Sequence, residues 1–138
     1  LMKEKTFDFS FSGLKSAVIN KLHNYRQKGE EINKNDVAAS FQASVTDVLT
    51  AKTLQALKQY DVNHLIIAGG VAGNSEIRRR FKILCEEENI NLQIPELKFC
   101  TDNAAMIGAA AYHLYKKNHL ADLKLNGRNF IDIEEYAF

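Results

Sequence analysis

Apolar residues recur at helical spacing through the first half of the chain. One stripe, from Gly13 to about Lys28, predicts a helix with Gly29 as its C-cap. The polar segment that follows predicts a loop, and Asn35 is placed to cap a second helix from Asp36 to about Tyr60. The second helix carries apolar residues on opposite sides in its later turns, which is typical of a helix covered twice in a layered α/β domain.

A short apolar run and a glycine-rich loop mark the middle of the chain. His64 to Ala68 predicts a buried parallel strand, the loop Gly69 to Asn74 follows it, and Ser75 to about Glu88 has helical periodicity. Asn91 to Ile94 predicts a second strand, which Pro95 ends. The expected buried face of the intervening helix is Ile77, Phe81, Leu84 and Cys85.

The last helical pattern runs from Asp102 to about Lys117, with Thr101 placed to cap it. Gly108 inside this helix costs about 1 kcal/mol against alanine, which favours tight packing on a neighbour. Asn129 to Ile133 is a further strand candidate. The expected inward face is Ile107, Ala110, Ala111 and Leu114. The order helix, helix, strand, helix, strand, helix predicts a single α/β domain, with helices packed on a small mixed sheet.

The composition is that of a globular protein and excludes several other classes. Of 138 residues, 46% are hydrophobic and 25% are charged, and no stretch approaches the about 20 apolar residues of a membrane span. The opening residues carry charges where a signal peptide needs an apolar segment. The formal net charge is +1, so any basic surface must be local. Cys85 and Cys100 have no disulfide-framework or metal spacing, which favours a cytoplasmic protein with reduced thiols.

The unit IIAGGVAGNS is the most informative chemical pattern. Gly69 and Gly70, at the end of a buried strand, would let backbone approach a ligand without an intervening Cβ. N–H groups at the start of the following helix would suit an anion or a sugar hydroxyl. Asn74 is placed either to cap that helix or to bind a ligand. The spacing is neither GxGxxG nor a P-loop, and an ordinary strand-to-helix turn also explains it.

Two charged features follow this loop in the sequence. Arg78, Arg79 and Arg80 lie early in their helix and three glutamates lie late, which opposes the helix macrodipole. An anionic partner at the basic end explains this arrangement, and so does a solvated face screened by salt. Asp102, at the start of the last helix, would be held ionised by the dipole and be competent to bind a metal. Nothing else in the sequence completes a metal site, so an ordinary first-turn aspartate is the simpler explanation.

Four stretches occur together in the order of one family. FSFSGLKSA, DVAASFQ, LIIAGGVAGNSEIR and PELKFCTDNAAMIG resemble the tRNA N6-adenosine threonylcarbamoyltransferase family, the TsaD/Gcp/Kae type formerly called O-sialoglycoprotein endopeptidase or glycoprotease. The tail DLKLNGR is also similar, so the resemblance extends from about Phe7 to Arg128. Gly73 departs from the pattern, because alanine is at least as usual there, and it makes the loop more flexible.

The resemblance implies an actin-like ATPase fold (ASKHA, ribonuclease H-like) of two lobes that close on a nucleotide. Residues 1–138 would be the second, C-terminal lobe, and the first lobe is absent from this sequence. By the same resemblance, Gly69 and Gly70 would cradle the adenosine and Asn74 would bind the substrate nucleotide. Asp102 would be one ligand of a divalent metal, iron or zinc, whose other ligands lie in an HxxxH motif of the first lobe.

The implied reaction moves a threonylcarbamoyl group from threonylcarbamoyl-AMP to N6 of the adenosine next to the anticodon, in tRNAs that read ANN codons. The nucleotide ligand would be threonylcarbamoyl-AMP or ATP. No catalytic residue is expected within these residues, and the isolated chain is predicted to be inactive. Implied partners are tRNA, a paralogous actin-like protein (TsaB type), a small ATPase (TsaE type) and a second copy of the lobe, with no membrane association.

Two other functions fit part of the pattern. A phosphotransferase of the same superfamily would share the glycine loop but should lack the TDNAAM helix start. A non-catalytic interaction module would use the second helix, Asp36 to Tyr60, or the small-residue helix as its surface. The endopeptidase label is discounted, because no zinc-protease helix motif is present.

Overall fold

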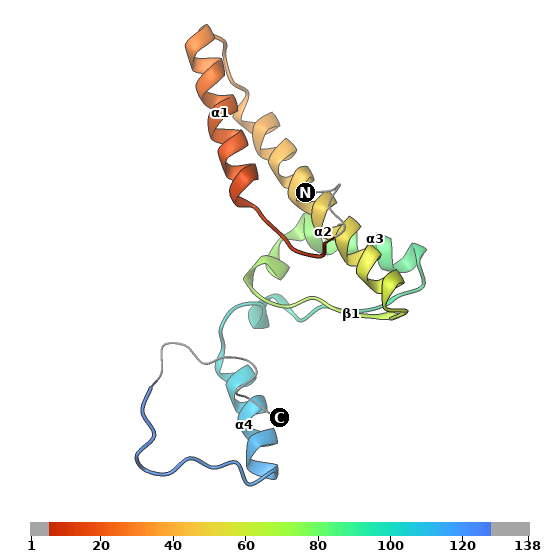
Figure 1. Ribbon diagram of the computed structural model, residues 1–138, viewed down its shortest axis with the longest axis vertical. Coiled ribbons are helices and arrows are strands. Elements are labelled where there is room, and N and C mark those ends of the chain that lie inside the picture. Colours follow the sequence, from red (N-terminus) through yellow and green to blue (C-terminus); the bar gives the residue numbers. More distant parts are fainter. Residues whose placement is uncertain (1–5, 128–138) are drawn as a thin grey trace.

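The computed structural model describes residues 6–127. Within them the predicted order of elements is confirmed, and the chain is an α/β protein (Figure 1). The helices are α1 (Ser12–Lys28), α2 (Lys34–Gln59), α3 (Ser75–Glu87) and α4 (Ala104–Lys116). The strands are β1 (His64–Ile66) and β2 (Asn91–Gln93), and short 3-10 turns lie at η1 (Gly70–Gly73) and η2 (Leu97–Phe99). The strand predicted at 129–133 lies outside the described residues.

The two strands pair in parallel, with α3 as the crossover between them. Leu65 of β1 lies opposite Leu92 of β2. The pairing continues past the strand, where the Ile67 N–H donates to the Gln93 carbonyl at 3.0 Å. Over residues 6–127 the sheet is therefore parallel rather than mixed, and β1 is shorter than predicted. The expectation of a buried strand is wrong for Ile66, which is 70% exposed because no helix among these residues covers its side of the sheet.

The core lies where α3 packs against α2 and η1. The predicted stripe of α3 is confirmed at Ile77, Phe81 and Cys85, all buried, while Leu84 is half-buried. Leu57 of α2 and Ala72 of η1 complete this contact. The helical periodicity of α3 predicted its buried face correctly, because one side of the helix meets both neighbours.

Lys52 of α2 is a buried cation outside that stripe. It is 4% exposed, and its Nζ donates to the carbonyl oxygens of Thr6 and Asp8 at 2.7 and 2.6 Å. The ring of Phe7 also packs against Tyr60, with centroids 5.7 Å apart. The segment before α1 is therefore held by two hydrogen bonds to α2 and by one aromatic contact to Tyr60, which follows α2.

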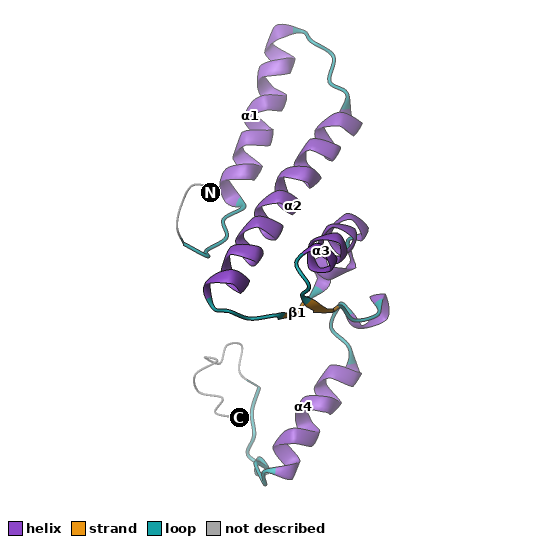
Figure 2. Ribbon diagram, turned by 90° about the vertical axis from the view of Figure 1, so that its right-hand side faces the viewer, coloured by secondary structure: helices purple, strands orange, loops and turns teal. Residues whose placement is uncertain are grey.

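Helices α1 and α2 form an antiparallel hairpin that extends beyond the sheet (Figures 1 and 2). Gly29 ends α1 with a φ of 68°, as predicted. The predicted cap of α2 is wrong: Asn33, not Asn35, caps this helix through its side-chain oxygen. No residue of α1 is buried, since only the facing side of α2 lies near it.

Helix α4 stands apart from the other helices in both views (Figures 1 and 2). It has no buried residue, and Ile107, predicted to face inward, is 62% exposed. A Cβ built on Gly108 would meet nothing within 4 Å, so the predicted tight packing does not occur among the described residues. Thr101 is not the cap, because the side chain of Asn103 accepts the N–H of Met106. Asp102 therefore precedes the helix instead of opening it.

Candidate functional site

The backbone turns sharply where β1 gives way to η1. Gly69 has φ 89° and ψ 170°, a conformation that is open essentially only to glycine. Its carbonyl accepts the Ala72 N–H at 3.0 Å, which closes the 3-10 turn. Gly70 follows, and a Cβ added there would lie 4.0 Å from Cγ2 of Thr101. The predicted glycine pair therefore lies at the edge of the sheet, next to the segment that leads into α4.

Asn74 caps α3, as one of its two predicted roles requires. Its Oδ1 accepts the N–H groups of Glu76 and Ile77, both at 3.0 Å. Its Nδ2 lies 3.5 Å from Oε1 of Gln42 on α2. Both polar ends of the side chain thus have partners within the chain, and Asn74 points toward α2 and α3.

Asp102 lies in the connection between η2 and α4. The residue is exposed, and the neighbouring Asn103 shapes the connection by donating from Nδ2 to the Thr101 carbonyl at 2.8 Å. Asp102 does not lie in the first turn of α4 as predicted, because the helix begins two residues later at Ala104. The argument that the helix dipole keeps this carboxylate ionised is therefore wrong. Solvent exposure still leaves the carboxylate free to meet a ligand.

Three of the four predicted site residues line one cavity. Gly69, Gly70 and Asp102 border an open hollow of about 710 Å³ at the carboxyl ends of the two parallel strands. Ligands of open α/β sheets bind in this position, outside the carboxyl ends of the strands. Asn74 does not line this hollow. The other lining residues are Ile66, Ala68, Leu92, Gln93, Ile94, Pro95, Phe99, Cys100, Thr101 and Met106.

The three consecutive arginines of α3 have three different partners. Arg79 donates to both carboxylate oxygens of Glu76, at 2.7 and 2.6 Å, and this pair holds the pKa of Glu76 below its ordinary value of 4.5. Arg80 pairs with Asp47 of α2. Arg78 turns inward to backbone carbonyls. Two of the three arginines thus form ion pairs with carboxylates of this chain. The charge pattern therefore does not require an external anion at this end of the helix.

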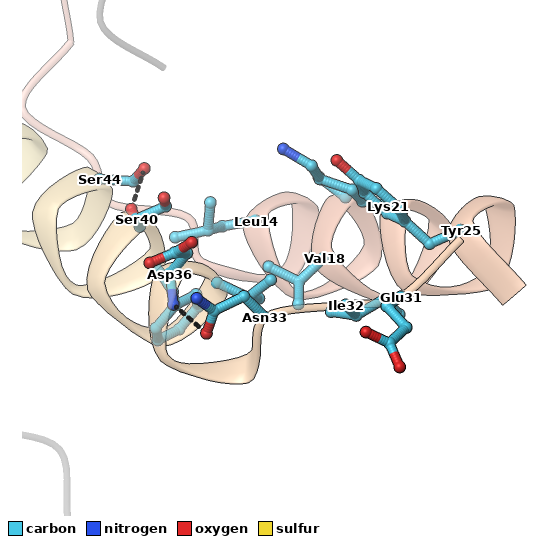
Figure 3. A pocket seen from close by; sticks show the side chains of 13 residues that line it. Leu14, Val18, Lys21, Tyr25, Glu31, Ile32, Asn33, Asp36, Ser40 and Ser44 are labelled. Atoms are coloured by element: carbon cyan, nitrogen blue, oxygen red, sulfur yellow. Dashed lines mark hydrogen bonds between the residues drawn. The ribbon is translucent and has the colours of Figure 1, made fainter.

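A second hollow, of about 420 Å³, lies between α1 and α2 (Figure 3). Leu14 and Val18 approach it from α1, and Asn33 and Asp36 from the start of α2 (Figure 3). Asn33 is already engaged in capping α2. None of the predicted site residues lies in this groove, so the hollow at the strand ends is the candidate site.

Over residues 6–127 no group of three or more His, Cys, Asp or Glu side chains is placed to hold a metal ion. Cys85 and Cys100 are free and buried, as predicted for reduced thiols, and burial raises the pKa of the Cys85 thiol. No helix of this part of the chain combines the length and the apolar character needed to cross a bilayer.

Sequence reasoning missed two contributors to this cavity. Gln93 ends β2 beside β1, and the parallel pairing alone brings it to the site. Thr101, taken only as a helix cap, lies against Gly70. The position of Gln93 near the carboxyl end of the second predicted strand was the available signal, since the carboxyl ends of parallel strands lie at the same edge.

Comparison with known proteins places these features in one family. A family model described as TsaD, tRNA N6-adenosine threonylcarbamoyltransferase, matches residues 1–109. A protein of that name from Staphylococcus haemolyticus is 61% identical over 134 residues, which are 97% of this chain and 39% of the relative. Proteins of the same name from Staphylococcus epidermidis and Staphylococcus aureus are 57% and 54% identical over 136 residues, or 99% of this chain and 40% of each relative.

The chain belongs to the TsaD family of tRNA N6-adenosine threonylcarbamoyltransferases. The resemblance stated from its four motifs is thereby confirmed. The chain spans about two fifths of the length of the curated relatives it matches. Activity, substrates and partners of the whole relatives are therefore considered as proposals for this chain.

Proposed function

We propose that this chain is part of a tRNA N6-adenosine threonylcarbamoyltransferase, in which it supplies one wall of the nucleotide site. The observation that carries the proposal is the position of Gly69, Gly70 and Asp102 around one hollow at the strand ends. The family match over residues 1–109 includes all three. The substrates would be threonylcarbamoyl-AMP and a tRNA that reads ANN codons.

The fold that we propose for the whole protein is the two-lobed actin-like ATPase fold, with this chain as the second lobe. The unit β1–η1–α3–β2, with its parallel strands, suits the ribonuclease H-like sheet of that fold. The exposed side chain of Ile66 leaves one side of the sheet open to further structure. The relatives also have about 60% of their length outside the matched region, which is enough for a first lobe.

In this proposal the chain binds and orients the nucleotide. The turn at Gly69 and Gly70 exposes backbone without a Cβ, so that the adenosine of threonylcarbamoyl-AMP lies flat against it. Asn74 would contact the nucleotide if its side chain left the cap of α3. In the reaction itself, N6 of the tRNA adenosine attacks the carbamoyl carbon and AMP leaves. These residues would promote the reaction mainly by holding the two reactants in the right orientation.

The metal proposed from the resemblance is tested by the chemistry of the donors present. Asp102 is a single exposed carboxylate, and iron or zinc sites need further nitrogen, sulfur or oxygen ligands. The described residues do not fit a complete metal site. Asp102 is therefore proposed as one ligand only, and no step of the reaction is assigned through a metal.

The partners proposed for the whole protein are those that the family resemblance implied: a paralogous actin-like protein, a small ATPase and a second copy. Helices α1 and α4 have no buried residue and leave surface for such contacts.

A hybrid protein tests the proposal. The matching segment of the full-length Staphylococcus haemolyticus relative is replaced by these 138 residues, and the hybrid is supplied with its partners, threonylcarbamoyl-AMP and a tRNA that reads ANN codons. We expect the modified adenosine in nucleoside digests from the hybrid and none from the 138-residue chain alone. Asp102→Ala should lower the hybrid's rate by about a hundredfold or more, and Asp122→Ala, outside the cavity, should leave it unchanged.

Three results would contradict the proposal. A folded hybrid that modifies no tRNA while the parent does would remove these residues from the reaction. Modification by the chain alone would show that no other lobe is needed. Phosphoryl transfer from ATP to a small substrate, unaffected by Asp102→Ala, would favour the phosphotransferase alternative.

A further inference from the structure

Arg78 is the one arginine of α3 that turns away from carboxylates. Its Nη1 donates to the Ala72 carbonyl at 2.9 Å, and its Nη2 donates to the Pro95 carbonyl at 2.9 Å. Nη1 also lies 3.6 Å from the sulfur of Cys100, which is 4% exposed. The guanidinium is a planar fork of N–H donors, so two well-aligned bonds fix its position in the plane.

The two carbonyls belong to the two walls of the candidate site. Ala72 lies in η1, two residues after Gly70, and Pro95 begins the segment that leads through Cys100 to Asp102. Among residues 6–127 no backbone hydrogen bond joins residues 69–74 to residues 95–102. Arg78 therefore joins two loops whose separation sets the width of the cavity.

The neighbouring arginines show that this arrangement is particular to Arg78. Arg79 and Arg80 bind carboxylates on the protein surface, where such pairs contribute little to stability. Arg78 instead satisfies part-buried carbonyls, and loss of its guanidinium would leave these acceptors without that donor. A lysine at this position has a single charged nitrogen on a flexible stem and cannot reproduce the planar fork.

We propose that Arg78 is a positioning residue, which sets the distance between the glycine loop and the Asp102 segment by holding Ala72 and Pro95 together. The role of that distance in nucleotide binding rests on the proposed function, whereas the link between the loops does not. Arg78 acts through the two loops and touches no part of the reaction itself. Its loss should weaken binding of the nucleotide more than it slows the chemical step.

The first test measures the link in the 138-residue chain itself. Labelling of the two buried thiols by a thiol reagent is followed by mass spectrometry for wild type, Arg78→Gln, Arg78→Lys and the matched control Arg79→Gln. We expect Cys100 to react at least about tenfold faster in both Arg78 variants, with Cys85 unchanged, since an opening of the two loops exposes only Cys100. Arg79→Gln should leave both thiols as in wild type.

Two outcomes of the labelling would overturn the link. Unchanged reactivity of Cys100 would show that Arg78 does not hold the loops together. An equal rise at Cys85, in the core against α2, would show that the variant loosens the whole domain. Hydrogen exchange of the α3 amides separates these cases, because it should be unaffected by loss of the link alone.

The second test measures nucleotide use in the hybrid enzyme. We expect Arg78→Gln to raise KM for threonylcarbamoyl-AMP about tenfold or more with kcat changed less than about threefold, and millimolar guanidinium to restore KM in Arg78→Ala. Faster labelling of Cys100 without any change in KM would overturn the positioning role. An equal fall of kcat in every Arg78 variant would also overturn it. If the wild-type hybrid is inactive, the proposed function fails while the labelling result for the link still stands.

Discussion

Gly69 and Gly70 are adjacent, but only Gly69 has a backbone conformation that requires glycine. Gly69 has φ 89° and ψ 170°, where an L side chain is strained. Gly70 does not have a positive φ, and a methyl group there would meet Thr101 at an ordinary van der Waals distance of 4.0 Å. The first glycine is thus required by the turn itself, and the second is required only if a ligand needs the space of its missing Cβ.

This difference predicts different effects of alanine at the two positions on stability and on nucleotide binding. Gly69→Ala should lower the free energy of unfolding by about 1–3 kcal/mol, measured by urea denaturation, because the turn must strain or shift. Gly70→Ala should change it by less than about 0.5 kcal/mol and weaken nucleotide binding instead. Equal destabilisation by both variants would contradict the assignment of the turn to Gly69.

The helix caps show how far single residues allow the ends of helices to be predicted from the sequence. Capping of α3, one of the two roles predicted for Asn74, is confirmed, and the signal was its position after a glycine-rich loop and directly before the periodic segment. The cap of α2 was misplaced by two residues, because Asn33 and Asn35 are equally suitable and only the extended backbone of Asn33 decides. The link made by Arg78 had no sequence signal, since its partners are backbone carbonyls six and seventeen positions away.

Helix α3 is the element whose sequence pattern was most informative. Its apolar stripe meets two neighbours, so the periodicity of one face and its burial agree. Its charges are less adverse than the sequence indicated, because Glu76 in the first turn is bound by Arg79 and complements the helix dipole. The bounds of β1 and α4 were harder to predict, because a strand of three residues and a helix without buried residues leave few periodic positions.

The Glu76–Arg79 pair makes the stability of α3 depend on pH in one direction. The hydrogen bonds from Arg79 lower the pKa of Glu76 in the folded chain, so the pair stabilises the fold above the ordinary value of 4.5. That stabilisation is lost as pH falls through the lowered pKa. Between about pH 5 and pH 3, Glu76→Gln should therefore lose less stability than wild type, measured as the urea midpoint.

Glu87→Gln, at the other end of α3, is the matched control for this dependence, and it should follow wild type over the same range. Both partners of the Glu76 pair are solvent-accessible, so the difference between wild type and Glu76→Gln should shrink in high salt. Identical pH profiles for wild type and Glu76→Gln would contradict the stabilising role of the pair.

At the scale of the whole molecule, the described part of the chain has one core and two helices, α1 and α4, without a buried residue. The sequence predicted an apolar stripe for α1 and an inward face for α4, but a stripe does not show which surface covers it. Within residues 6–127 nothing buries a residue of either helix. The chain matches only about two fifths of each relative. In the proposed whole protein, the neighbours of α1 and α4 would lie in the remaining three fifths.

This arrangement predicts uneven stability along the isolated chain. Helix α4 has 13 residues, and helices shorter than about 12–15 residues are marginal in water without tertiary contacts. In dilute solution its amides should exchange with deuterium at least about a hundredfold faster than those of α3, which packs on α2 and η1. In the hybrid with the Staphylococcus haemolyticus relative, the amides of α4 should become protected, because the rest of that protein would cover the helix. Equal protection of α3 and α4 in the isolated chain at every concentration would contradict this prediction, whereas protection that grows with concentration would assign the covering surface to a second copy.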